Sequence, residues 1–135
     1  MSGAGGDPGR HRAVLIVAHG SRRAESNEEV RRLAARVAEQ LAADPAILCV
    51  ESAFLELAEP DIGAGIDRCV ARGAREVIVL PYFLAAGRHV QQDIPEWVRA
   101  ARDRHPEVRI VLGPHLGASE ELAALLIRLG HRAAR

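Results

Sequence analysis

The sequence predicts a single α/β domain that is built on a four-stranded parallel β-sheet. Apolar runs rich in β-branched residues alternate four times with stretches of helical hydrophobic spacing, and the connections between them are short. A length of 135 residues is sufficient for one hydrophobic core but not for two. Strands that alternate with helices in this way form a parallel sheet with helices on both faces, linked by right-handed crossovers.

The first strand is predicted at residues 14–17, a continuous apolar run suited to a strand that is buried on both faces. The glycine-rich residues 1–12 are expected to form a disordered tail ahead of a domain at residues 13–130. The next helix is predicted to begin with a capping box formed by Ser26 and Glu29, because each side chain satisfies a backbone N–H group near the other. Its apolar positions then recur at helical spacing: Val30, Leu33, Ala34, Val37 and Leu41.

The remaining units repeat this pattern. The other strands are predicted at residues 47–55, 76–81 and 109–112. Aspartate, proline, serine and glycine mark the ends of the other helices. One helix is predicted from Pro60-Asp61 to Gly73, and the last from Ser119 to Gly130. The helix between them is predicted to be capped by Asp93, with Pro95 in its first turn. Residues 131–135 are expected to form a C-terminal tail.

The strand order is inferred from topology. A flavodoxin-like order of 2-1-3-4 is the natural arrangement for such a small sheet, and it has a switch point between strands 1 and 3. The first strand runs directly into residues 18–22 (AHGSR) without a Gly-x-Gly-x-x-Gly turn, so a dinucleotide-binding function is disfavoured.

Composition argues against several other classes of function. The 18 basic and 18 acidic side chains balance, which argues against a nucleic-acid or membrane-surface partner. Cys49 and Cys69 stand among apolar neighbours at a spacing of twenty residues, which indicates core positions rather than a thiolate metal site or a disulfide. The apolar run at residues 13–18 is much shorter than a signal-peptide core or a membrane span, so a cytoplasmic protein is expected.

Three side chains that could bind a metal ion follow the first three strands. His19 ends the first strand, Glu56 follows the second, and His89 lies in the loop predicted after the third. In the order 2-1-3-4 these loops are neighbours at the carboxyl ends of the strands, where open α/β sheets bind ligands. Two imidazoles and a carboxylate suit a divalent ion such as Co²⁺, Fe²⁺, Ni²⁺ or Zn²⁺.

Other candidates remain at this point. The competing carboxylates are Glu51, Glu59, Asp61 and Asp93. His115 lies on the same rim after the fourth strand, whereas His105, at a helix end before a proline, is expected to have a structural role. His11 and His131 fall in the predicted tails.

Five segments carry a resemblance to a known family: residues 17–22 (VAHGSR), 53–60 (AFLELAEP), 79–84 (VLPYFL), 87–90 (GRHV) and 93–95 (DIP). Together, in this order and spacing, they resemble the CbiX/SirB family of sirohydrochlorin chelatases over about residues 13–130. The resemblance implies a chelatase-type flavodoxin-like fold in which His19, Glu56 and His89 hold the incoming metal.

The resemblance also implies a function. The expected enzyme is a lyase that inserts Co²⁺ or Fe²⁺, or alternatively Ni²⁺, into sirohydrochlorin without a nucleotide or a prosthetic group, in cobalamin or siroheme biosynthesis. Glu56 is expected to act as a ligand, as a base, or as both. Because sirohydrochlorin is a polycarboxylate, Arg22, Arg23 and Arg88 are candidate partners for it, or else solvated surface residues.

The apolar residues after the third strand have three possible roles. Phe83 and Leu84 either cover the macrocycle, or lie at an interface between subunits, or pack inward beneath their loop. The chain contains one such unit where longer family members contain two, so a homodimer is predicted in which the rims that carry His19 and His89 face each other.

Three other functions compete with the chelatase. A non-catalytic metal or tetrapyrrole carrier would use the same residues. A hydrolase with Ser21 as nucleophile lacks the Gly-x-Ser-x-Gly elbow. An FMN-binding protein would need a phosphate loop rich in serine and threonine, whereas this loop carries Arg22, Arg23 and Glu25.

Overall fold

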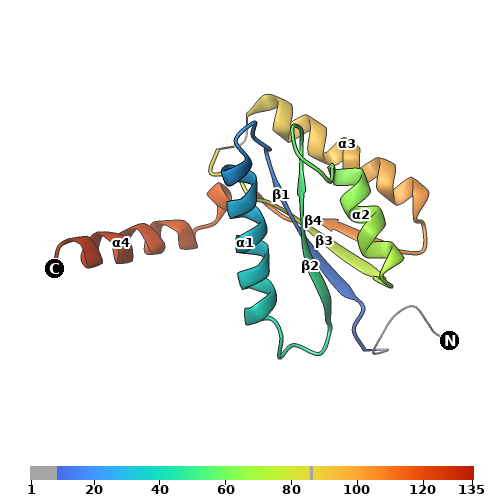
Figure 1. The fold of residues 1–135 in the computed structure, drawn as a ribbon, viewed down its shortest axis with the longest axis horizontal. Helices are drawn as coiled ribbons and strands as arrows, with labels where there is room; N and C mark the ends of the chain where they lie inside the picture. Colours follow the sequence, from blue (N-terminus) through green and yellow to red (C-terminus); the bar gives the residue numbers. More distant parts are fainter. Residues whose placement is uncertain (1–8, 86) are drawn as a thin grey trace.

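The computed structural model describes residues 9–85 and 87–135, and for His89 it describes the backbone alone. Within these residues, four strands and four α-helices alternate, with one 3₁₀ helix before the last α-helix (Figure 1). Their bounds are β1 (Arg12–Ala18), α1 (Ala24–Gln40), β2 (Ile47–Phe54), α2 (Ile62–Ala71), β3 (Glu76–Pro81), α3 (Arg88–Arg104), β4 (Arg109–Leu112), η1 (Leu116–Ala118) and α4 (Glu121–Ala133).

The four strands form one parallel sheet of order β2-β1-β3-β4, which confirms the predicted fold class and strand order. The central strand β1 is buried from Ala13 to Ala18, as expected for a strand with neighbours on both edges and both faces. The point at which the strand order reverses therefore lies between β1 and β3, and the loops after β1, β2 and β3 are neighbours in space.

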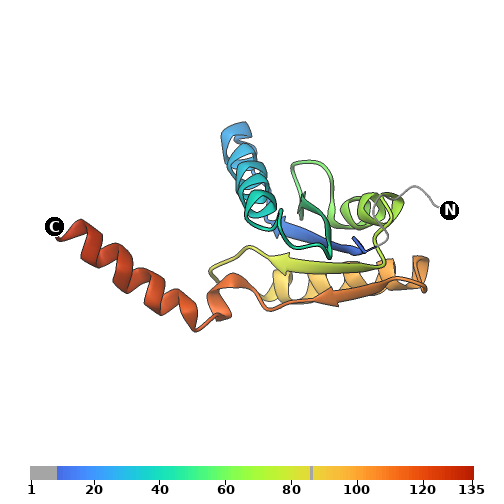
Figure 2. The ribbon, with the colours of Figure 1, turned by 90° about the horizontal axis from the view of Figure 1, so that it is seen from below.

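Helices cover the two faces of the sheet unequally. Leu15 and Val17 of β1 face the main core, to which α2 contributes Ile66 and α3 contributes Val98. The intervening β1 residues face a smaller cluster that includes Ala34 of α1. The last helix, α4, has no buried residue and extends away from the rest of the domain (Figures 1 and 2).

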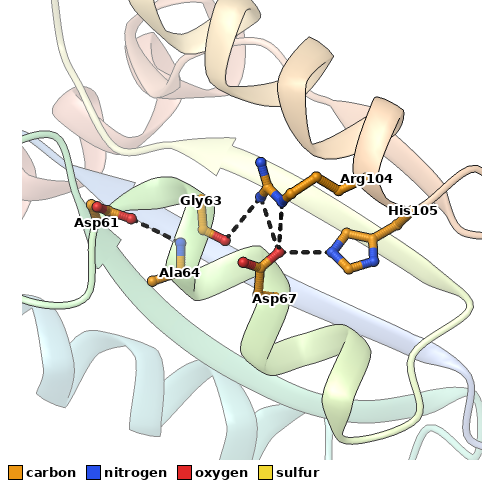
Figure 3. A network of polar contacts seen from close by, with 6 residues as sticks. All are labelled: Asp61, Gly63, Ala64, Asp67, Arg104 and His105. Carbon is orange, nitrogen blue, oxygen red and sulfur yellow. Dashed lines mark hydrogen bonds and ion pairs between the residues drawn. The ribbon is translucent and has the colours of Figure 1, made fainter.

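A polar network joins α2 to the end of α3 (Figure 3). The Asp67 carboxylate accepts hydrogen bonds from Arg104 Nη2 at 2.9 Å and from the His105 ring at 2.7 Å. Burial opposes the ionisation of Asp67, but the hydrogen bonds from His105 and Arg104 outweigh it and hold its pKa below the ordinary value. His105 thus has a structural partner at a helix end, in line with the role expected for it.

The start of α3 differs from the prediction. The helix begins at Arg88 after Gly87 as N-cap, so Asp93 and Pro95 lie inside it, and the predicted Asp93 cap is wrong. His89 is accordingly in the first turn of α3 rather than in a loop. Its side chain lies outside the described part of the structure.

Packing explains the longer helix. Ile94 is buried in the main core, and Val90, one turn earlier, packs against the same core. A helix that starts at residue 88 places both side chains on one face, whereas Pro95 forgoes a single backbone hydrogen bond. The capping preference of aspartate and proline is a local signal, and the core contact prevails over it.

Several other boundaries also differ. The helix α1 begins at Ala24 without a side-chain cap, so the predicted capping box of Ser26 and Glu29 is wrong. The strand β1 includes Arg12, and α4 continues to Ala133, past the expected domain limits. Most of the predicted N-terminal tail falls on residues 1–8, outside the described residues.

Two further expectations concern the core and the membrane. Cys49 and Cys69 are both buried free thiols, as predicted for core positions. In the part of the chain that the structure describes, none of the helices has the length and apolar character needed to cross a membrane.

Candidate functional site

The candidate site lies where β1 and β2 end together. Beyond the last paired residues, the Leu55 N–H group donates to the Ala18 carbonyl at 3.0 Å, and the Glu56 N–H group donates to the His19 carbonyl at 3.2 Å. These bonds extend the pairing of the two strands into the loops. His19 and Glu56 are therefore brought together by backbone register, although they come from separate loops.

The side chains of this pair approach each other at the surface. His19 Nε2 stands 3.5 Å from Glu56 Oε2, and each side chain is 59% exposed. Two donors that share one tetrahedral ion through bonds of about 2.1 Å stand about 3.4 Å apart. The observed separation therefore fits a shared divalent ion, and the exposure leaves further coordination positions open.

Gly20 is required by this close approach of the two loops. Its φ of 94° is unfavourable for residues with a side chain. A Cβ atom at this position would lie 1.7 Å from the Glu56 carbonyl oxygen. In the sequence, the candidate ligand His19 is thus followed by a glycine, and only a glycine at this position lets the Glu56 backbone come so close.

Asn27 holds the segment that follows His19, and sequence reasoning did not identify it. Its buried amide accepts a hydrogen bond from Ser21 N–H at 2.9 Å and donates one to the Ser21 carbonyl at 2.8 Å. The Ser21 hydroxyl accepts a hydrogen bond from Arg23 N–H at 3.0 Å, so it stabilises the turn into α1. An asparagine on the buried face of a predicted helix is the sequence signal for such a clamp.

Phe83 packs inward and contacts the site at the same time. It is half-buried against the main core, and its ring meets the His19 ring edge-on, with a centroid distance of 6.2 Å. Contact with Phe83 restricts the orientation of the imidazole. Leu84, the other apolar candidate, is 67% exposed on the same loop.

A pocket of about 320 Å³ adjoins the pair. Its lining consists of His19, Leu55 and Glu56 from the first two loops, and Val90, Asp93 and Trp97 from α3. Because α3 begins at Arg88 and not at Asp93, Asp93 lies within the helix and lines this pocket. Two of the competing carboxylates are engaged elsewhere, since Glu51 pairs with Arg72 and Asp61 caps α2.

The third predicted ligand, His89, occupies the position one helical turn before Asp93 on α3. Among the side chains that the structure describes, no three of His, Cys, Asp and Glu form a group able to hold a metal ion. The described part of the site is therefore a two-donor pair, with Asp93 on the wall of the adjoining pocket.

The predicted substrate-binding arginines lie in the segments that follow β1 and β3. Arg22 and Arg23 lie between β1 and α1, and Arg88 is the first residue of α3, and all three are exposed. His115 lines a different pocket of about 230 Å³ beside β4, which shares Val90 with the first pocket.

Comparisons of the sequence and of the structure with known proteins all indicate the same family. The CbiX family model matches residues 13–132. Sirohydrochlorin cobaltochelatase of Priestia megaterium is 37% identical over 115 residues, which make up 85% of this chain and 36% of the relative. Sirohydrochlorin ferrochelatase of Bacillus subtilis (strain 168) is 38% identical over 110 residues, 82% of this chain and 41% of the relative. The chain spans about two fifths of the length of these curated relatives.

Solved structures share the fold. The CbiX protein from Marinobacter aquaeolei VT8 is 28% identical with a TM-score of 0.75, and the match covers 91% of this chain and 97% of that one. The sirohydrochlorin chelatase SirB from Bacillus subtilis subspecies spizizenii, in complex with cobalt, is 35% identical with a TM-score of 0.70 and 90% and 50% coverage. The match to the family model over most of the chain, together with these likenesses, shows that the chain belongs to the CbiX family.

Proposed function

We propose that the chain is a sirohydrochlorin chelatase that inserts Co²⁺ or Fe²⁺, or alternatively Ni²⁺, into the free-base tetrapyrrole without a nucleotide. The observation that carries the proposal is the exposed pair of His19 Nε2 and Glu56 Oε2, 3.5 Å apart at the carboxyl ends of β1 and β2. Relatives named as cobaltochelatase and ferrochelatase support both the substrate class and the first two metals.

The metal ion is a substrate that must be bound, stripped of water and released. A neutral imidazole at His19 donates to the ion without cancelling its charge, and Glu56 supplies the second donor. Nitrogen and oxygen donors of this kind suit Co²⁺, Fe²⁺ and Ni²⁺. By the family resemblance, His89 is the third ligand. With so few protein donors, pyrrole nitrogens can take over the remaining positions.

Insertion also releases two protons from pyrrole N–H groups for each divalent ion bound. A carboxylate that lies against the macrocycle can accept them one at a time and pass each proton to solvent before it takes the next. Glu56 and Asp93 line the same pocket, so one carboxylate can remain on the metal while the other takes a proton. Glu56 and Asp93 can therefore divide the roles of metal ligand and proton acceptor, which Glu56 would otherwise have to perform alone.

The surrounding rim provides groups for the macrocycle. The exposed guanidinium groups of Arg22, Arg23 and Arg88 can form charge-assisted hydrogen bonds with its carboxylates. Leu84 is exposed on the loop after β3 and can pack on the ring, whereas Phe83 supports His19 from the core side.

The proposal extends to the setting of the enzyme. As a lyase it would act in the cytoplasm, in cobalamin biosynthesis with Co²⁺ or in siroheme biosynthesis with Fe²⁺. The chain corresponds to one of the two units expected in longer family members, so two copies would enclose the tetrapyrrole between facing rims.

Anaerobic absorbance measurements test the proposal. Sirohydrochlorin is incubated with Co²⁺, Fe²⁺ and Ni²⁺ in turn, with the protein at a hundredth of the substrate concentration. Spectral conversion of the whole substrate pool, faster than without protein, is the expected result. Conversion that stops at one equivalent per chain would instead identify a carrier, and no acceleration with any metal would contradict the proposal.

A further inference from the structure

The pocket beside the candidate metal donors has an aromatic wall. Trp97 of α3 lines this pocket of about 320 Å³ together with His19 and Glu56. It is the one tryptophan of the sequence. The side chain packs against the main core, but the residue is only half-buried. The indole therefore presents apolar surface inside the pocket that contains the metal donors.

The same indole adjoins a second pocket. This outer pocket has a volume of about 220 Å³ and is lined by Asp93, Glu96, Trp97 and Ala100, which recur at helical spacing on one face of α3. Because open space adjoins the indole in both pockets, a smaller apolar side chain in its place would leave no enclosed cavity. The domain therefore does not depend on a tryptophan at this position to fill its core.

A glycine on the neighbouring helix sets the position of the indole. A Cβ atom on Gly63 of α2 would lie 3.0 Å from Trp97 Cζ3 and 3.2 Å from Cε3, so the ring packs closely against this helix. Arg104, farther along α3, donates to the Gly63 carbonyl at 3.4 Å and to the Asp67 carboxylate at 2.9 Å (Figure 3). These bonds join α2 to α3 and so hold the indole in place.

Metal insertion brings the macrocycle to this wall. The pyrrole nitrogens at the centre of the ring must reach the ion that His19 and Glu56 hold, and the flat ring extends outward from that centre. The apolar residues of the pocket are Leu55, Val90 and Trp97. Of these three, only Trp97 has a flat conjugated face, and flat rings stack favourably on one another.

Charge determines which part of the substrate can approach the pocket. Glu56 and Asp93 line it, and their negative charges repel the carboxylates of the substrate. The candidate arginines, Arg22, Arg23 and Arg88, are not among the lining residues. The acid side chains of the substrate should therefore remain outside with the arginines, while the apolar ring faces the pocket and its indole.

We propose that Trp97 is a tetrapyrrole-binding residue whose indole stacks on the bound macrocycle, and that Gly63 holds the indole in the position for this contact. This inference rests on the proposed function and adds the residue that recognises the ring itself. The metal donors and the indole then bind different substrates. Loss of the indole should weaken the binding of the tetrapyrrole and leave the binding of the metal ion unchanged.

Equilibrium titration with metal-free sirohydrochlorin, followed by the fluorescence of the tetrapyrrole, tests the contact. Trp97→Leu keeps apolar volume but removes the flat ring, so the Kd should rise about tenfold, as for loss of one stacking contact. Trp97→Phe is the matched control, because it keeps a flat ring, and its Kd should stay within about threefold of the unaltered chain. The Kd for Co²⁺, measured by calorimetry, should be the same in both variants.

The kinetics of insertion provide a second measurement. In Trp97→Leu the KM for sirohydrochlorin should rise by about the same tenfold factor while kcat changes little, since the lost contact binds the ring before and during insertion. A change in kcat alone would contradict a role in substrate binding.

A further variant moves the indole without altering it. Gly63→Ala places a methyl group 3.0 Å from Trp97 Cζ3, so the ring must shift by a few tenths of an ångström. The Kd for sirohydrochlorin should rise about threefold. In a Trp97→Leu background the same Gly63→Ala change should have no effect, because no indole is left to displace.

The outcomes separate this inference from the proposed function. An unchanged Kd for sirohydrochlorin in Trp97→Leu, an equal loss in Trp97→Phe, or a parallel loss of Co²⁺ binding would overturn the stacking contact. If urea unfolding shows that Trp97→Leu does not fold, an unchanged Kd in Gly63→Ala would overturn it instead. Binding of sirohydrochlorin without metal insertion contradicts the proposed function alone, and insertion with normal affinity in Trp97→Leu contradicts the Trp97 contact alone. No binding by the unaltered chain would contradict both.

Discussion

The two ends of the sheet use charged side chains for opposite purposes. At the amino end, Glu76 is 7% exposed, and its carboxylate accepts hydrogen bonds from Arg12 at 2.6 Å and from Arg109 at 2.7 Å. At the carboxyl end, His19 and Glu56 are each 59% exposed and stand 3.5 Å apart. A satisfied ion network stabilises the fold, whereas an exposed pair at the switch point leaves its donor atoms accessible to a ligand.

The strongest test of this contrast removes the candidate ligands. His19→Ala and His89→Ala should each abolish nearly all metal insertion, because the ion would lose a ligand. The free energy of unfolding of His19→Ala should change by no more than about 1 kcal/mol, since an exposed side chain leaves no cavity. Turnover is measured by absorbance and stability by urea unfolding. His115→Ala, on the neighbouring pocket, is the matched control, and near-normal turnover in either ligand variant would contradict the site.

The second test concerns the carboxylates of the pocket. Glu56→Gln keeps the shape of the side chain but removes its charge and its capacity to accept a proton, so turnover should fall by about 10²-fold. Asp93→Asn should alter the pH–rate profile if Asp93 shares the proton transfer. Glu51→Gln serves as control, because Glu51 is paired with Arg72 away from the pocket. Unchanged turnover and pH profile in Glu56→Gln would transfer the role to Asp93.

The third test breaks the other end of the sheet. Glu76→Gln removes the negative charge that two arginines share, and the free energy of unfolding should fall by about 2 kcal/mol, as for loss of charged hydrogen bonds. The turnover of folded protein should be unchanged, since Glu76 is at the opposite end of β3 from the site. Urea unfolding and the chelatase assay measure the two effects. A large loss of turnover in the folded variant would show that the two ends are not independent.

The smallest expected effect is the pH dependence of stability. The hydrogen bond from Arg12 lowers the pKa of Glu76, and the partners of Asp67 lower its pKa despite partial burial. Since both pKa values are lower in the folded state, these groups stabilise the fold above about pH 4, the ordinary carboxylate range. This stabilisation is lost as the pH falls through the lowered values. The slope of stability against pH in that window should be smaller in Glu76→Gln, and an unchanged slope would contradict the assignment.

Much of the site could be predicted because its geometry follows from the order of the strands. His19 and Glu56 come directly after consecutive strands, so a sheet of order 2-1-3-4 must bring them together. Asp93 could not be assigned in the same way. Its local signals, an aspartate two residues before a proline, favour a helix cap, and only the burial of Ile94 and the packing of Val90 show that the helix begins earlier.

Asn27 and α4 illustrate the same limit. In the sequence, Asn27 is simply one polar residue of an amphipathic helix, yet in the structure its side-chain amide forms hydrogen bonds with both the N–H and the carbonyl group of Ser21. The leucine stripe of α4 predicts a helix but does not reveal what covers it. In both cases the partner is distant in sequence or belongs to another surface, so periodicity carries no information about it.

The sequence by itself determined the alternation of strands and helices, the parallel sheet and the residue types at its carboxyl edge, because hydrophobic period and turn chemistry act over a few residues. Only the tertiary structure decided the 3.5 Å approach of His19 to Glu56, the place of Asp93 on their pocket and the exposure of α4. These features depend on contacts between residues far apart in the chain, and the packing of the whole domain determines which of those contacts form.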